Sequence, residues 1–116
     1  MKIHHLALRT RDLPRLRAFY ADVLGLVVAK EEAGRCVWLE AGGTLVMLER
    51  ATDSEPTVPE GSFDLVAFAI EKREKGALET RLLSRGVPIE ARTDFTLYFR
   101  DPDGRRVGLS HYVRGE

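Results

Sequence analysis

The sequence predicts an α+β protein built from two tandem βαβββ modules, which form a curved mixed sheet around a cleft with the helices outside. Three observations support this prediction. One strand, one helix and three strands follow each other twice within 116 residues, the two copies align residue by residue, and a polar loop separates them. We expect a single domain over residues 1–116, with modules at about 1–50 and 63–116 joined by a loop at 51–62.

The first module begins with a strand, because apolar and polar residues alternate from Ile3 to Arg9. Helix signals follow in RDLPRLRAFYADVLG: Asp12 can cap the helix, Pro14 suits its first turn, and Gly25 can end it in a left-handed conformation. The apolar stripe of this helix consists of Leu13, Leu16, Phe19, Tyr20, Val23 and Leu24. Further strands are predicted at 26–31, 35–40 and 44–50, with turns at EEAG and AGG.

The second module repeats this order. We predict a strand at 63–70, a helix at 74–85 that stops at Gly86, and strands at 87–91, 95–100 and 106–112, with DPDG as the last tight turn. His5 aligns with Leu65 and Trp38 with Tyr98 at one common offset. After the longer DPDG turn the offset grows by one residue, and Met47 then aligns with Gly108. Such an internal duplication restricts the fold far more than any single motif.

Composition excludes several classes of protein. Apolar residues make up 44% and charged residues 31%, and 18 basic residues balance 18 acidic ones, so no net field attracts nucleic acid or an anionic membrane. No membrane-spanning run or signal-peptide core is visible. The single cysteine, Cys36, excludes an intramolecular disulfide and a Cys-rich zinc site. We expect a cytoplasmic protein. The lack of Asn and Gln fits a thermophile, although a GC-rich genome would give part of the same pattern.

Two stretches carry a family resemblance: IHHLALRTRDLPRLRAFYADVLGL at the start and LYFRDPDGRRVGL near the end. With the paired modules, they resemble the vicinal oxygen chelate superfamily, which includes glyoxalase I, bleomycin-resistance proteins, fosfomycin-resistance transferases and extradiol dioxygenases. The resemblance spans essentially the whole chain and implies a homodimer. It also implies that His5 stands at a metal-ligand position, whereas Leu65 stands where a His is usual and Gly108 where a Glu is usual. Met47 occupies the fourth position.

These four positions predict that the metal has been lost. A catalytic zinc or similar ion needs about three protein ligands within roughly 2.0–2.3 Å. Leucine and glycine side chains offer no ligand atom, and a thioether suits hard or borderline divalent cations poorly. Strand alternation also directs His4 away from His5. The remaining carboxylate, Glu49, lies roughly 7 Å beyond Met47 along its strand. We therefore expect no bound metal and no cofactor, with His5 as the only retained ligand position of the family.

Strand alternation also gives the candidate ligand-binding residues on the concave face. They are His5, Trp38, Met47, Glu49, Leu65, Tyr98, Arg100, Ser110 and Tyr112. Two interpretations of the aromatic residues stay open, because they can fill the core or form a wall that stacks on a flat ligand. For His5 we favour a hydrogen bond to Tyr98, Tyr112 or a backbone carbonyl.

The charged candidates have a structural and a functional interpretation. Arg9 and Arg100 suit a solvated rim with ion pairs, one of them to Glu49, or a clamp for a carboxylate or phosphate. Cys36 is interpreted as a quiet, half-buried thiol, because no nearby base or cation is evident in the local sequence.

The function predicted from these residues is metal-free binding of a small molecule in the cleft, in the manner of bleomycin-resistance proteins. The alternative is a metal-dependent lyase, isomerase or dioxygenase of the same superfamily. A third hypothesis is a metal-free enzyme that uses His5, Tyr98 or Glu49 as acid or base. Whether the chain catalyses a reaction stays open, and catalytic residues are unknown.

Overall fold

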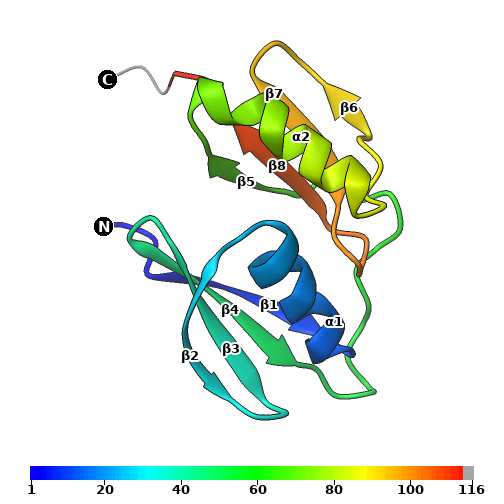
Figure 1. Ribbon diagram of the computed structural model, residues 1–116. Coiled ribbons are helices and arrows are strands. Elements are labelled where there is room, and N and C mark those ends of the chain that lie inside the picture. The colour runs from blue at the N-terminus through cyan, green and yellow to red at the C-terminus, as the bar shows by residue number, and fades with distance from the viewer. Residues whose placement is uncertain (114–116) are drawn as a thin grey trace. The chain divides into compact units, whose positions relative to one another are not determined.

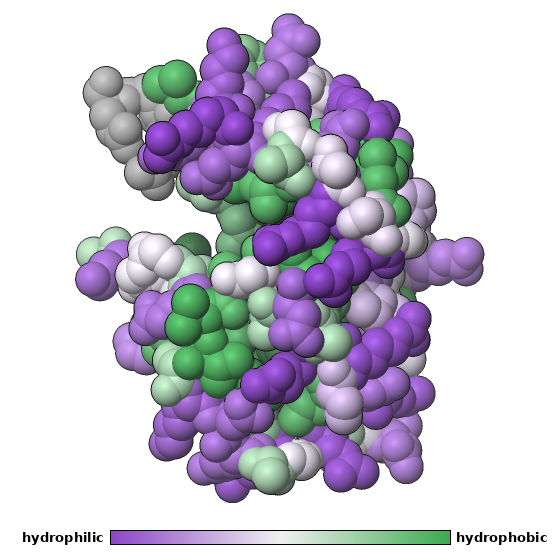
Figure 2. Space-filling model, viewed as in Figure 1, coloured by the Kyte–Doolittle hydropathy of each residue, from purple (hydrophilic) through white to green (hydrophobic). Residues whose placement is uncertain are grey.

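The computed structural model describes residues 1–113, and the chain separates into two compact units, one over Met1–Thr57 and one that begins at Val58 (Figure 1). Each unit contains one four-stranded sheet and its own helical segments. Among the described residues, none of the helices is both long and apolar enough to cross a membrane. The face drawn in Figure 2 is mostly covered by hydrophilic residues, with smaller apolar patches between them.

The first unit has its strands in the order β1-β4-β3-β2. Its elements are β1 (His5–Thr10), α1 (Leu13–Arg17), the π-helical segment η1 (Ala18–Val23), β2 (Val27–Glu32), β3 (Cys36–Ala41) and β4 (Thr44–Arg50). β1 runs parallel to β4, whereas β3 is antiparallel to both β4 and β2. The sheet is therefore mixed, as predicted.

The second unit repeats this topology with the order β5-β8-β7-β6. Its elements are β5 (Leu65–Ala69), the 3₁₀ helix η2 (Lys72–Glu74), α2 (Lys75–Ser84), β6 (Ala91–Arg92), β7 (Thr96–Arg100) and β8 (Arg106–Ser110). β5 runs parallel to β8, and β7 is antiparallel to β8 and β6.

The strand registers agree with the sequence duplication. In the first unit Met47 lies between Ala7 on β1 and Trp38 on β3. In the second unit Gly108 lies between Ala67 on β5 and Tyr98 on β7. Met47 and Gly108 are thus equivalent positions, as are Trp38 and Tyr98. The predicted α+β fold with two βαβββ modules is confirmed, and the hydrogen bonds form two sheets, one for each module.

Each sheet has one buried face and one more open face, because alternate side chains point to opposite sides. Figure 1 shows α2 lying across the second sheet. The largest apolar side chains of the cores are almost fully buried; they include Leu16, Tyr20, Leu39, Leu48, Leu82, Leu97, Phe99 and Val107. On the opposite face of β1 and β5, the odd-numbered side chains His5, Ala7 and Arg9, and Leu65, Ala67 and Ala69, are exposed. The predicted separation into helix-facing and open-facing residues therefore holds.

The first helix is less regular than its sequence suggests. Asp12 caps it by accepting a hydrogen bond from the Arg15 N–H at 3.2 Å, Pro14 lies in the first turn, and Gly25 has φ 85°. After Arg17 the helix widens, so that the Leu24 N–H donates to the Phe19 carbonyl five residues earlier. Such π-helical turns occur as single bulges within helices and are defined by hydrogen bonds between residues five apart, which the apolar stripe does not reveal. The sequence therefore predicted a helix but not its widening.

Several predicted boundaries in the second module were too generous. The predicted strand at 87–91 is reduced to Ala91–Arg92, although the Glu90 N–H still donates to the Tyr98 carbonyl at 2.8 Å. β5 and β8 end earlier than expected. The helical segment, by contrast, begins before the predicted residue 74, with the 3₁₀ turn Lys72–Glu74. A short apolar run predicts that a strand exists better than it predicts where the strand ends. Flanking residues can be equally apolar without forming the hydrogen bonds of the sheet.

Candidate functional site

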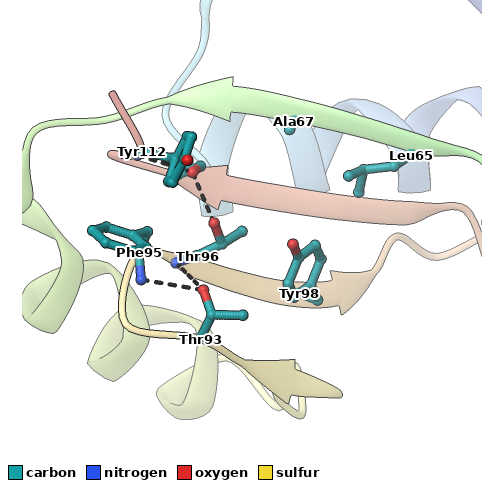
Figure 3. A pocket seen from close by; sticks show the side chains of 8 residues that line it. Leu65, Ala67, Thr93, Phe95, Thr96, Tyr98 and Tyr112 are labelled. Carbon is teal, nitrogen blue, oxygen red and sulfur yellow. Dashed lines mark hydrogen bonds between the residues drawn. The ribbon is translucent and has the colours of Figure 1, made fainter. Parts of the chain in front are cut away.

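The second unit contains a pocket of about 430 Å³ on the open side of its sheet (Figure 3). Its lining residues come from β5, β7, β8 and the segments that adjoin β7 and β8. They are Leu65, Ala67, Thr93, Phe95, Thr96, Tyr98, Ser110 and Tyr112. A volume of this size lies within the range of small-molecule sites in proteins.

Strand geometry explains how this set converges. Thr96 and Tyr98 are two residues apart on β7 and so share a face, and Thr96 is the register partner of Ser110 on β8. Tyr112 follows the end of β8 and Phe95 precedes β7, and their rings meet edge to face with centroids 5.1 Å apart. These two rings form one end of the pocket, and Leu65 and Tyr98 lie toward the other end (Figure 3).

The polar groups of the pocket are hydroxyls. The Thr96 hydroxyl donates to Ser110 Oγ at 2.7 Å, and Ser110 Oγ also accepts a hydrogen bond from the Tyr112 N–H at 3.1 Å. Thr93 Oγ1 accepts hydrogen bonds from the N–H groups of Phe95 at 3.1 Å and Thr96 at 3.0 Å (Figure 3). No residue that lines the pocket carries a charged side chain. The site therefore offers aromatic surface and hydroxyl groups rather than a formal charge.

Charged residues adjoin Tyr98 on the same side of the sheet and are paired with one another. The guanidinium of Arg106 lies 4.2 Å from the ring centroid of Tyr98 and 4.9 Å from that of Phe63, so it is held by cation–π contacts. Glu90 accepts hydrogen bonds from Arg100 at 2.5 and 2.9 Å and from Arg106 at 3.3 Å. The pKa of Glu90 is lowered, chiefly because its carboxylate accepts hydrogen bonds from Arg100.

Arg100, a predicted ligand-binding residue, is occupied by the protein itself. Beyond Glu90, it donates to the backbone carbonyls of Ser62 at 2.5 Å and Gly104 at 3.2 Å. These contacts tie β7 to the segment before β5 and to the turn before β8. Its structural role is therefore clear, whereas the predicted ligand contact stays a prediction.

In the first unit, Arg9 pairs with Glu49, as expected, and also with Glu55 at 2.6 Å. Glu55 accepts a further hydrogen bond from the Thr52 N–H at 2.7 Å. The Arg9 hydrogen bond, followed by that of Thr52, lowers the pKa of Glu55 to about 2. The Glu49 carboxylate is thus held in an ion pair with Arg9 on the first sheet. Glu55 was missed because it lies in the loop, where alternation makes no prediction.

His5 and Trp38 lie together on the open face of the first sheet. Their ring centroids are 5.2 Å apart with an interplanar angle of 67°, and Trp38 is the register partner of Met47. The predicted separation of His4 from His5 is wrong, because Nδ1 of His4 lies 2.8 Å from Nδ1 of His5. His4 precedes the first strand residue, so strand alternation does not govern its direction.

Cys36, at the start of β3, is buried rather than half-buried, with its thiol 3.8 Å from a carboxylate oxygen of Glu32. Its low reactivity stays a prediction from the sequence.

The superfamily's metal-ligand positions can be tested on their chemistry. In the second unit, the Leu65 side chain covers the bare backbone of Gly108: a Cβ atom added at Gly108 would lie 3.5 Å from Leu65 Cδ1 and 3.4 Å from the Ala67 Cβ. Apolar packing thus occupies the place where two ligand side chains are usual. Residues 1–113 contain no group of three or more His, Cys, Asp or Glu side chains arranged to hold a metal ion. The donor set does not fit a metal with three protein ligands.

Apart from Ala67, which shares its strand face with Leu65, three lining residues were not predicted to form the site. Thr96 shares its strand face with Tyr98, so the period of two could have found it. Phe95 and Thr93 lie before the strand begins, in the turn closed by the hydrogen bond from the Thr93 N–H to the Thr96 carbonyl at 3.0 Å. Side-chain direction in such a turn cannot be read from alternation.

Comparison with known proteins identifies the class to which this fold and pocket belong. Residues 2–109 match the family model described as the glyoxalase/bleomycin resistance protein/dioxygenase superfamily. The chain is therefore a member of this superfamily, and the resemblance to the vicinal oxygen chelate proteins is confirmed.

Individual relatives differ in what they do. Biphenyl-2,3-diol 1,2-dioxygenase 3 of Rhodococcus globerulus is 30% identical over 93% of this chain, which spans only 62% of that enzyme. Metallothiol transferase FosB of Shouchella clausii is 30% identical over 88% of this chain and 74% of its own length. The crystal structure of lactoylglutathione lyase from Agrobacterium tumefaciens is similar with a TM-score of 0.73, 27% identity, and coverage of 94% of this chain and 92% of that one.

Proposed function

We propose that this superfamily member binds a small, uncharged aromatic molecule in the pocket on the open side of its second sheet, and that it does so without a metal. The observation that carries the proposal is the lining of that pocket. Its eight residues combine aromatic and aliphatic surface with hydroxyl groups and include no charged side chain.

The lining favours a flat ligand that carries hydroxyl or carbonyl groups. The rings of Phe95, Tyr98 and Tyr112 offer surfaces for stacking or edge-to-face contact. The hydroxyls of Thr96 and Ser110 are already linked to each other at 2.7 Å, and each hydroxyl oxygen has further hydrogen-bonding capacity. A relative with 30% identity is named for its action on biphenyl-2,3-diol, an aromatic compound with two hydroxyl groups, which supports this ligand class.

The surroundings disfavour a cationic ligand. Arg106 lies against the Tyr98 ring, and Arg100 and Arg106 share one carboxylate, Glu90, so this trio has a net positive charge. A cation placed beside Tyr98 would be repelled, and one face of that ring is engaged by the guanidinium. This argues for neutral over cationic aromatic compounds.

The experiment is a binding series with matched probes. Biphenyl-2,3-diol, catechol and benzylamine are titrated by calorimetry into metal-stripped, untagged protein, and thermal unfolding is followed in parallel. Saturating the protein at 100 times Kd should stabilise it by ~2.7 kcal/mol, which raises Tm by several degrees. We expect the two phenols to bind and benzylamine not to bind. Equal binding of all three compounds, or binding of none, would contradict the proposal.

Two exposed phenylalanines of the same unit give a matched pair of variants. Phe95 lines the pocket and is 41% exposed, whereas Phe63 is 75% exposed and lies outside the lining. Phe95→Ala should weaken binding of the biphenyl probe at least about tenfold, which corresponds to ~1.4 kcal/mol. Phe63→Ala should leave the affinity nearly unchanged. The reverse order of effects would exclude this pocket.

The second candidate is a metal-dependent lyase, isomerase or dioxygenase. It is favoured by the names of the relatives, which include a metallothiol transferase and a lactoylglutathione lyase. This candidate requires stoichiometric metal uptake that enables turnover of a substrate. Dioxygenase or lyase activity that appears on adding metal and disappears in His5→Ala would establish it in place of the first.

A homodimer and a cytoplasmic location accompany this proposal as predictions from the sequence. Members of this superfamily of similar size are commonly dimeric, and the second copy would cover part of the exposed apolar surface. Sedimentation equilibrium distinguishes a monomer from a dimer directly, because the dimer has twice the chain mass of 13.1 kDa.

A further inference from the structure

Adjacent histidines stand where the chain enters the first sheet. Nδ1 of His4 and Nδ1 of His5 lie 2.8 Å apart, and their rings are nearly perpendicular, with an interplanar angle of 81°. In the metal-free protein one Nδ1 carries a hydrogen and donates a hydrogen bond to the other Nδ1. The two Nδ1 atoms are therefore already within hydrogen-bonding distance of each other.

We propose that His4 and His5 form a two-histidine clip for a nitrogen-preferring divalent transition metal such as Cu(II), with water completing the coordination. When a metal binds, the proton shared by the two nitrogens is released to solvent and both lone pairs are directed to the ion. This site goes beyond the proposed ligand pocket, because it lies on the other unit and uses none of the pocket residues.

The distance fits this chemistry. Imidazole nitrogens bind first-row divalent metals at about 2.0–2.1 Å. Two nitrogens 2.8 Å apart at such bond lengths subtend an angle of roughly 85–90° at the ion, by triangle geometry with the same bond lengths. That angle suits neighbouring positions of a tetragonal or octahedral sphere better than a tetrahedral one, and tetragonal nitrogen coordination is typical of Cu(II) and Ni(II).

The pair is anchored at its backbone and open at its side chains. The Leu45 N–H donates to the His4 carbonyl at 3.3 Å, and His5 pairs with Leu45 in the β1–β4 register, so both residues are held against β4. Both side chains are exposed, which leaves the rings free to rotate until both lone pairs face one ion. The Trp38 ring packs on His5 and limits its movement to one side.

Such a clip differs from the superfamily's metal position. That position would join His5 to residues on other strands, which here are Met47, Leu65 and Gly108 and do not fit a metal. The clip instead joins His5 to its neighbour in sequence. His4 therefore separates the two arrangements: the clip needs its imidazole, and the superfamily position does not.

Trp38 supplies the readout. It is the only tryptophan in the chain, and its ring centroid lies 5.2 Å from that of His5. A paramagnetic ion bound at the clip would lie close to it and quench its fluorescence. Untagged, metal-stripped protein is titrated with Cu(II) alone, and the stoichiometry is measured by calorimetry. We expect one ion per chain and saturable quenching.

The variants decide the outcome. His4→Ala and His5→Ala should each weaken Cu(II) binding at least about tenfold, which corresponds to ~1.4 kcal/mol. His111→Ala removes the third histidine, whose ring packs on Phe95, and should leave both affinity and quenching unchanged. Loss on His5→Ala with full retention on His4→Ala would overturn the clip, as would non-saturable binding to the unsubstituted protein. His4 belongs neither to the pocket nor to the predicted ligand-binding residues, so His4→Ala should leave the aromatic-ligand affinity that of the unsubstituted protein; failure of the pocket proposal would appear separately in the Phe95 series.

Discussion

The turn between β7 and β8 is predicted to depend on one buried carboxylate. Asp101 is the first residue of DPDG, and its side chain has no exposed surface. Its Oδ1 accepts hydrogen bonds from the N–H groups of Asp103 at 2.9 Å and Arg105 at 3.0 Å, and its Oδ2 pairs with the Arg105 guanidinium at 3.2 Å. Because β7 and β8 carry Tyr98 and Ser110, this turn also fixes the geometry of the pocket. The perturbation we choose is Asp101→Ala.

The expected loss follows from these contacts. Hydrogen bonds to a charged group contribute roughly 1.5–3 kcal/mol each, so two of them give roughly 3–6 kcal/mol. The turn is partly accessible to water, which can satisfy the released N–H groups, so we expect the lower end, about 3 kcal/mol. That agrees with ~3–5 kcal/mol for removing one partner of a buried ion pair. Asp101→Asn retains one acceptor oxygen and should fall between Asp101→Ala and the unsubstituted protein.

Urea unfolding followed by circular dichroism measures this loss. With a slope of about 2 kcal/mol/M, a loss of about 3 kcal/mol lowers the midpoint by ~1.5 M. The matched control is Asp103→Ala, because the Asp103 carboxylate is 23% exposed and pairs with the same Arg105. A partly exposed ion pair contributes at most about 1 kcal/mol. Equal midpoints for the two alanine variants would refute the assignment of Asp101 as the organising residue of the turn.

Two further predictions concern the first loop and the second sheet. Arg9 holds the pKa of Glu55 at about 2, below its ordinary value of 4.5, so the stability from this carboxylate is present above pH 4.5 and is lost as the pH falls toward 2. Glu55→Gln should therefore lower Tm at pH 7, and the difference from the unsubstituted protein should shrink at pH 3; a constant difference would contradict the pairing. Gly108→Ala adds a methyl group at ordinary contact distance from Leu65 in a strand without positive φ, so urea unfolding should show a gain of about 0.4–1 kcal/mol. A loss of more than 1 kcal/mol would show that the close packing there requires glycine.

Much of the fold was predictable because the duplication and the local signals agree. The pairs that the duplication aligns, Trp38 with Tyr98 and Met47 with Gly108, are equivalent positions in the strand registers. Asp12 and Gly25 fixed both ends of the first helical segment through capping and left-handed geometry. The widening at η1 and the shortening of β6 were not predictable, because both depend on backbone hydrogen bonds that the apolar pattern does not specify.

The site was predicted less completely. Alternation identified Leu65, Tyr98, Ser110 and Tyr112, which line the pocket, because these residues follow the period of a strand or continue it. Alternation gave the wrong side-chain direction for His4, which precedes the strand, and it made no prediction for Phe95, which lies before β7. Local regularity therefore predicts side-chain direction within an element, whereas contacts at element ends require coordinates.

Among residues 1–113, every β ladder closes within its own half. The first sheet draws only on residues up to Arg50 and the second only on residues from Leu65 onward. Cutting the chain between Thr57 and Val58 would break no strand pairing, and would leave the Arg9–Glu55 and Ser62–Arg100 contacts each within a single fragment. The gene could therefore be divided at this point into two separately translated halves, each retaining all the backbone bonds of its own sheet.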